Sequence, residues 1–238
     1  MFICSKTCSL LDFDRSFVHI MRAMMPILPR PRTQVEDVFI RATPRKLYEV
    51  LWAELSQAYP EEFKKVMAEC TWESGLIRLP HQRRARIETK LLQIAHSLNI
   101  VATIERFPNT TDTFVLLHIS ESVKLIVCYV SSKIRAVRYA VAREQLALEH
   151  NRPYLFTPDP KAVVLPSLSA FGILAHSSQP KDVGSFGEAD IIFPAPQGGK
   201  LLGSLSLEAE MEQVQLEDAR KAKEVTRKVE IKIKKQGS

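Results

Sequence analysis

The residues of this sequence best suited to metal binding or nucleophilic catalysis are its six histidines and four cysteines. The histidines stand singly, at His19, His81, His96, His118, His150 and His176. None of them falls at the i, i+4 spacing of helical metal ligands, and Cys4 and Cys8 have no second pair at zinc-finger spacing. Cys128 lies in an apolar run, which is typical of a buried small side chain. We therefore predict no metal, no cofactor and no reactive thiol.

The clearest enzymatic pattern consists of Asp112, Glu121 and Lys124, which follow a predicted helix and lie among three predicted strands before another helix. This element order and these residue types resemble the core of the restriction-endonuclease-like nucleases, which use two carboxylates and a lysine. Glu121 and Lys124 are three residues apart, so they face opposite sides of a regular strand. Asp112 and Glu121 lie beyond opposite ends of one strand, roughly 25 Å apart at ~3.3 Å per residue. A nuclease is therefore the less favoured alternative.

Other polar groups favour structural interpretations. Ser120 and Ser122 flank Glu121 without the strand-to-helix turn of a nucleophile elbow, so we expect a hydrogen-bonded turn. Glu88 follows Arg84 by four residues, the spacing of an intrahelical ion pair. The glycines form no phosphate-binding loop. We predict no catalytic residue, and the sequence favours a non-enzymatic protein while leaving enzymatic activity open.

Basic residues outnumber acidic ones by 33 to 27, a formal charge of +6. They gather in two runs near the starts of predicted helices, where backbone N–H groups also attract phosphate. In the helix predicted over 82–99, the apolar spacing places the basic residues on or near the face exposed to solvent. The candidate phosphate contacts are Arg78, Arg83, Arg84, Arg86, Lys90, Lys133, Arg135 and Arg138. No zinc finger or RNA-recognition motif is visible. The sequence thus predicts a nucleic-acid-associated or regulatory protein that contacts the phosphate backbone of DNA or RNA.

The C-terminal segment is polarised in charge. Residues 208–218 carry five acidic side chains, and residues 220–235 carry eight basic ones against two acidic. This order complements a helix macrodipole, so we predict a helix over 207–229 that projects from the domain because its apolar stripe is thin. The alternating residues 229–234 are typical of a strand and could end the helix early. The alternative function is a protein–protein adaptor, with antiparallel self-association through this helix.

The elements that position these residues are best defined between Pro44 and His150. Apolar spacing predicts helices over 44–59, from Pro60 onward, over 82–99 and over 132–150. Strands are predicted over 100–107, 113–119 and 123–130, joined by short turns as an antiparallel meander. The second and third strands are apolar on both faces, so helices must cover both. The predicted fold class is α+β.

Domain boundaries follow from composition. We expect an extended leader over residues 1–43, an α+β domain over 44–196 with its best-defined part over 44–150, and a linker over 197–206 containing Gly198-Gly199. Residues 207–238 form the charged helix and basic tail. Between 151 and 196, prolines separate short apolar runs at 162–165, 171–175 and 191–193, which are predicted short strands.

No run of eighteen uncharged apolar residues exists, and the N-terminus lacks a clean signal-peptide core. The sequence therefore predicts no membrane partner, and the few irregularly spaced cysteines predict a cytoplasmic, reducing compartment. Whether residues 1–24 belong to the native protein or form a targeting segment stays open.

Overall fold

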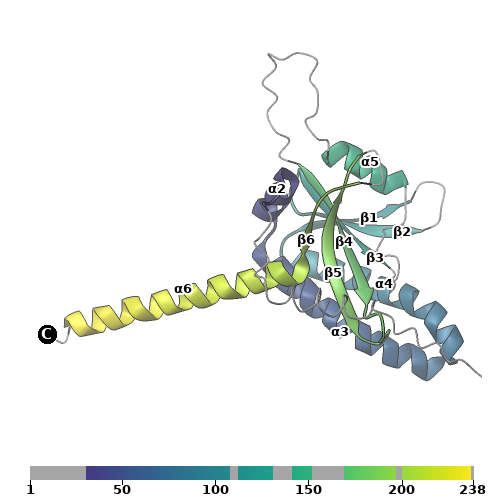
Figure 1. Cartoon of the computed structure of the whole chain (residues 1–238), viewed down its shortest axis with the longest axis horizontal. Helices are drawn as coiled ribbons and strands as arrows, with labels where there is room; N and C mark the ends of the chain where they lie inside the picture. Colours follow the sequence, from purple (N-terminus) through teal and green to yellow (C-terminus); the bar gives the residue numbers. More distant parts are fainter. Residues whose placement is uncertain (1–30, 108–111, 131–140, 152–168, 197–199, 237–238) are drawn as a thin grey trace, which may run out of the picture. The chain divides into compact units, whose positions relative to one another are not determined.

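A computed structural model describes residues 31–107, 112–130, 141–151, 169–196 and 200–236 of the chain, with side chains described as far as Glu224. Residues 33–238 form one compact unit, a mixed α+β structure built on a six-stranded sheet. Helices precede, interrupt and follow the strands (Figure 1).

The folded unit begins with helix α2, Gln34–Ala42, inside the predicted leader. Glu36 accepts a hydrogen bond from the backbone N–H of Thr33 at 2.8 Å and another from that of Ser204 at 2.7 Å. Phe39 is fully buried and stacks edge-on against Phe193. The boundary predicted at residue 44 is thus too late, because a short amphipathic helix docks on the sheet before Pro44.

Two long helices follow, α3, Arg45–Glu69, and α4, Trp72–Ser97. We predicted that Pro60 restarts a helix and that the next helix begins at Gln82, yet Pro60 and Pro80 both lie inside continuous helices. A proline removes one backbone hydrogen bond. Buried residues on both sides of each proline, such as Leu55 and Val66 in α3, hold the helix together across it.

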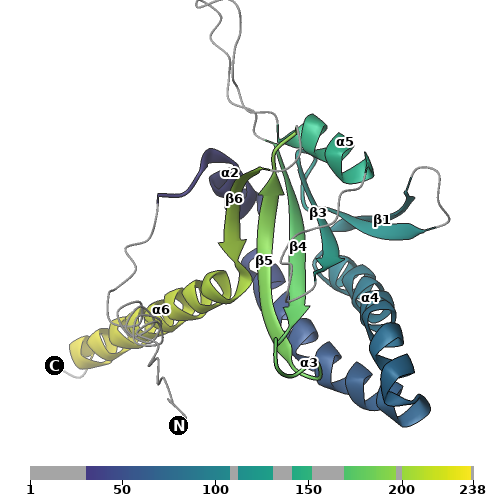
Figure 2. The same cartoon turned by 45° about the vertical axis from the view of Figure 1, so that its right-hand side comes forward.

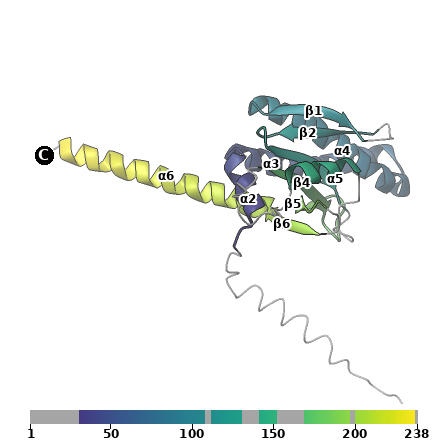
Figure 3. The same cartoon turned by 90° about the horizontal axis from the view of Figure 1, so that it is seen from above.

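The six strands are β1, Val101–Arg106; β2, Thr113–His118; β3, Val123–Tyr129; β4, Ala170–Ser178; β5, Phe186–Pro194; and β6, Leu201–Ser206. They lie in sequence order from one edge of the sheet to the other (Figures 2 and 3). β1, β2 and β3 pair antiparallel, as predicted, but they form only half of a larger mixed sheet. The predicted three-stranded sheet was too small.

β3 and β4 are parallel, and the intervening chain contains helix α5, Val141–His150. A parallel pair needs a crossover connection, and α5 belongs to it. The apolar runs at 171–175 and 191–193 lie within β4 and β5, whereas the run at 162–165 falls outside the described residues. Of the helix predicted over 132–150, residues 131–140 also fall outside them.

Different helices cover the two faces of the sheet. On one face Leu117, Leu125 and Leu174 share a large core with α2, α3 and α4. On the other face Phe114, Ile126 and Phe171 pack with Ala142 and Ala147 of α5. The α5 face has the smaller apolar cluster, and it also holds the polar groups described below.

The predicted linker contains β6, which runs directly into helix α6, Leu207–Gln236. α6 therefore continues through 229–234, where an alternating pattern suggested a strand. Its first turns dock, because Leu207 and Val214 are buried, while every residue from Gln215 to Glu224 is exposed. Among the described residues, none of the helices combines the length and apolarity needed to cross a bilayer.

Candidate functional site

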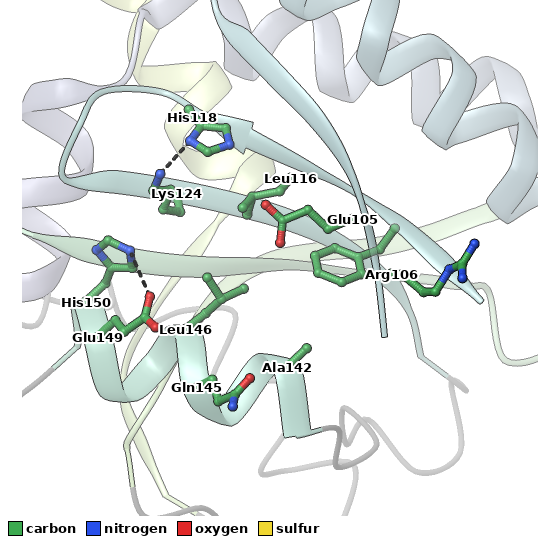
Figure 4. Close-up of a pocket in the computed structure, with 11 residues that line it drawn as sticks. Glu105, Arg106, Leu116, His118, Lys124, Ala142, Gln145, Leu146, Glu149 and His150 are labelled. Carbon is green, nitrogen blue, oxygen red and sulfur yellow. Dashed lines mark hydrogen bonds and ion pairs between the residues drawn. The ribbon is translucent and has the colours of Figure 1, made fainter. Parts of the chain in front are cut away.

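A cavity of about 270 Å³ lies between α5 and the face of β1, β2 and β3 that α5 covers (Figure 4). Residues from these four elements line it: Glu105, Arg106, Phe114, Leu116, His118, Lys124, Ala142, Gln145, Leu146, Glu149 and His150. Strand alternation places Phe114, Leu116 and His118 on one face of β2, directed toward the helix. The cavity thus combines apolar side chains with a concentration of titratable groups.

Lys124 and His118 are direct cross-strand partners on β3 and β2. The Lys124 ammonium donates a hydrogen bond to Nδ1 of His118, so this nitrogen carries no proton. Nε2 of His118 then carries the imidazole proton and donates to Oγ1 of Thr103 at 2.9 Å. The Thr103 hydroxyl donates in turn to Glu105 at 3.2 Å. A directional hydrogen-bond chain therefore runs from the ammonium to a carboxylate across three strands.

Both histidines of the cavity are held in the neutral form. Burial lowers the pKa of His118, and the positive charge of Lys124 lowers it further, although Glu105 opposes the shift. Burial and Lys124 likewise lower the pKa of His150, against the opposing effect of Glu149. Because an unperturbed histidine titrates near 6.5, both imidazoles are uncharged at neutral pH.

Lys124 makes no ion pair among the described residues, and its hydrogen-bond partner is an uncharged imidazole. Lys124 is half-buried, and its ammonium has hydrogens left to donate after the bond to His118. Glu149, the carboxylate of α5 that lines the cavity, is mostly exposed, with its side chain 66% accessible. Glu105 reaches the ammonium only through Thr103 and His118, so neither of the two carboxylates that line the cavity is paired directly with Lys124.

Apolar side chains form part of the cavity lining. Leu116 comes from the sheet, and Leu146 and Ala142 come from α5. Asn151 secures the end of this helix, because its side-chain amide donates to the carbonyl oxygens of Phe171 and Pro194 and accepts from the N–H of Phe171. The position of α5 over the cavity is thus tied to β4 and β5.

The predicted phosphate-contacting residues that the structure describes lie on α4 and do not line this cavity. Arg83 is only 1% exposed; its guanidinium lies 4.0 Å from the ring centre of Tyr59 and donates to the carbonyl oxygens of Tyr59 and Val183. The prediction that Arg83 belongs to an exposed basic face is therefore wrong. The helical periodicity of the sequence placed Arg83 among solvent-exposed residues, but the loop before β5 covers this part of α4.

The other described cations of α4 are paired with carboxylates. Arg78 pairs with Glu69, Arg84 with Glu88, Arg86 with Glu61 and Glu62, and Lys90 with Glu54. The predicted Arg84–Glu88 pair is thereby confirmed. Lys133, Arg135 and Arg138 fall outside the described residues. The structure therefore describes the candidate contacts of only the first of the two basic runs.

The nuclease-like residues do not converge. Asp112 immediately precedes β2, and Glu121 lies in the turn beyond the far end of the same strand. Lys124 faces the cavity beside His118. The predicted turn is present, because Oγ of Ser120 accepts the N–H of Val123 at 3.1 Å. In the described segments, no three His, Cys, Asp or Glu side chains are arranged to hold a metal ion.

A second polar cluster lies on the opposite side of the sheet but is closed to solvent. The hydroxyl of Tyr59 is 2.7 Å from Nδ1 of His176, and both side chains are fully buried. Burial lowers the pKa of His176 to about 3, and Arg83 acts in the same direction. This cluster supports the fold, and the α5 cavity is the better candidate site.

No family model, curated protein or solved structure matches this chain. The site therefore has to be judged on its own geometry. The sequence analysis did not predict this site. It could have predicted that His118 and Lys124 lie on the same face, because they are at matching positions on either side of a short turn. The contribution of His150 depends on the crossover that places α5 over β1, β2 and β3.

Proposed function

We propose that this protein is a regulatory, ligand-binding protein whose α5 cavity takes a small organic anion with an apolar body. The observation that supports the proposal is that Lys124, a half-buried residue, donates from its ammonium to the neutral imidazole of His118. A carboxylate is a stronger acceptor for an ammonium than an imidazole, because the hydrogen bond is then charge-assisted from both sides.

The apolar part of the cavity supports a ligand with a hydrocarbon body. Leu116 and Leu146 line the same cavity as Lys124, so an anion bound to the ammonium would have apolar side chains available for its hydrocarbon part. The volume of about 270 Å³ suits a ligand of a few heavy atoms, near the lower end of small-molecule sites. A branched short-chain carboxylate fits both requirements.

Calorimetric titration of the full chain with 4-methylpentanoate tests the proposal. We expect saturable binding of the carboxylate, and at least about tenfold weaker binding of the isosteric, uncharged 4-methylpentanamide. Lys124→Met should reduce the affinity for the carboxylate by about tenfold or more, because it removes the charge while keeping an apolar side chain of similar length.

Lys90→Met is the matched control. Lys90 is also a partly exposed lysine, but it lies on α4 next to Glu54 and does not line the cavity. This variant should bind 4-methylpentanoate like the unaltered chain. Equal affinities for the acid and the amide, or an unchanged affinity in Lys124→Met, would contradict an anion site at Lys124.

Nucleic-acid association through the phosphate backbone stays a prediction, and we rank it second. The carboxylates that pair with Arg84 and Arg86 would have to be displaced or tolerated next to phosphate, which weakens the case for α4. Replacing Lys133, Arg135 and Arg138 with glutamate and measuring DNA and RNA binding at two salt concentrations would test the remaining basic run.

A further inference from the structure

We infer that an anion bound at Lys124 is accompanied by one proton, which His118 takes up at Nδ1. The inference rests on the proposed anion site and describes how that site is regulated. It makes ligand binding sensitive to pH in the range where histidine side chains titrate.

The hydrogen bond between Lys124 and His118 is the first reason. Nδ1 accepts from the ammonium, and Nε2–H donates to Thr103, so the imidazole has no position for a second proton while Lys124 stays in place. Without a bound anion, these hydrogen bonds therefore keep Lys124 charged and His118 neutral. Protonation of Nδ1 requires that the ammonium turn to another acceptor.

A bound anion supplies that acceptor. The ammonium can donate to the anion with its remaining hydrogens, and the negative charge of the anion favours an imidazolium beside it. When the ammonium also turns away from Nδ1, that nitrogen can take a proton from water, and the new Nδ1–H can donate to the same anion. In the complete step the site takes one anion and one proton from solution, and no covalent bond in the ligand is formed or broken. The site gains one positive charge as the ligand contributes one negative charge.

The groups that face His118 from the neighbouring elements favour this exchange. From β1, Glu105 is connected to Nε2–H through the Thr103 hydroxyl and stabilises an imidazolium. From β3, Lys124 opposes the imidazolium, and a bound anion offsets that repulsion. From α5 come Glu149 and His150, of which His150 is the competing site for the proton.

The affinity of the full chain for 4-methylpentanoate, measured between about pH 6 and pH 8, tests the inference. We expect the affinity to fall with rising pH, approaching tenfold per pH unit between the pKa values of His118 in the free and bound states. Histidine NMR spectra should show the ring signals of His118 moving to imidazolium shifts as the ligand is added.

Two variants distinguish the histidines. His118→Gln can still accept from Lys124 and donate to Thr103 but cannot titrate, so its affinity should lose the pH dependence. His150→Gln should retain it. The opposite pattern would overturn the assignment to His118. Binding that is independent of pH would overturn the proton coupling but leave the anion site intact, whereas an absence of binding at every pH would contradict the proposed function itself.

Discussion

His118 on β2 and Lys124 on β3 face each other across the strand pair, and the lysine donates to Nδ1 of the histidine. On the other side of the sheet His176 of β4 is hydrogen-bonded to Tyr59 of helix α3, and this histidine is completely buried. Both histidines are kept neutral, but only His118 lines a cavity that a solute can enter.

Removing the charge of Lys124 should raise the pKa of His118 toward its ordinary value. Lys124 is one of the two causes that lower this pKa, and the other, burial, remains in Lys124→Met. Histidine NMR titration measures the change directly. Lys90→Met should leave the titration of His118 unaltered, and an equal shift in both variants would refute a local effect of Lys124.

The free energy of unfolding should depend on pH through His176. Its pKa is about 3 in the folded protein, against about 6.5 for an unperturbed histidine. Between these values the unfolded chain binds the additional proton, so stability is lost as the pH falls from 6.5 toward 3, by up to about 1.4 kcal/mol per pH unit.

Urea unfolding at several pH values checks this dependence. His176→Gln cannot titrate and should show a weaker dependence than the unaltered chain, although His118 and His150 still contribute in the same direction. An identical dependence in His176→Gln would mean that His176 is not the group responsible.

Charge reversal should have unequal effects at adjacent positions on α4. Arg83→Glu places a carboxylate among the carbonyl oxygens of Tyr59 and Val183 and should lower the free energy of unfolding by at least about 3 kcal/mol. Arg84→Glu changes a partly exposed position and should cost less than about 1 kcal/mol. Chemical denaturation compares the two, and equal losses would contradict the burial of Arg83.

Gly203→Ala should destabilise the attachment of α2 to β6. A methyl group at position 203 would lie 2.7 Å from Oγ1 of Thr33 and closer still to the Glu36 carboxylate that accepts from Ser204. We expect a loss of about 1–3 kcal/mol in thermal or urea unfolding. Leu201→Ala, at an exposed position of the same strand, is the control and should have a much smaller effect.

Truncation should separate the docked and exposed parts of α6. Deleting residues 219–238 removes no side chain that is described as buried, so the unfolding midpoint should stay nearly constant. Deleting residues 207–238 also removes Leu207 and Val214 from the core, so the unfolding midpoint should fall clearly. Hydrogen exchange provides the matching measurement, with slow exchange near Leu207 and faster exchange after Gln215.

Local sequence patterns were sufficient for the elements whose partners are close in the chain. The short turn at Ser120 predicts that β2 and β3 are antiparallel, and the apolar residues on both faces of these strands predict cover on both sides. Turn chemistry and alternation act over a few residues, so they can be recognised without tertiary structure. The charge order after Leu207 likewise predicts α6, because the macrodipole is a property of the helix itself.

Tertiary packing decided the features that depend on distant segments. Helical periodicity alone predicts that Arg83 is exposed to solvent and that a helix ends before Pro60. In the structure the loop before β5 covers Arg83, and packing against α4 keeps α3 continuous through Pro60. β4 joins β3 across a long crossover, and only this pairing extends the sheet and brings His150 toward Lys124. Burial and long-range strand pairing arise from segments that meet after folding, so the sequence supplied the side chains of the cavity while the fold brought them together.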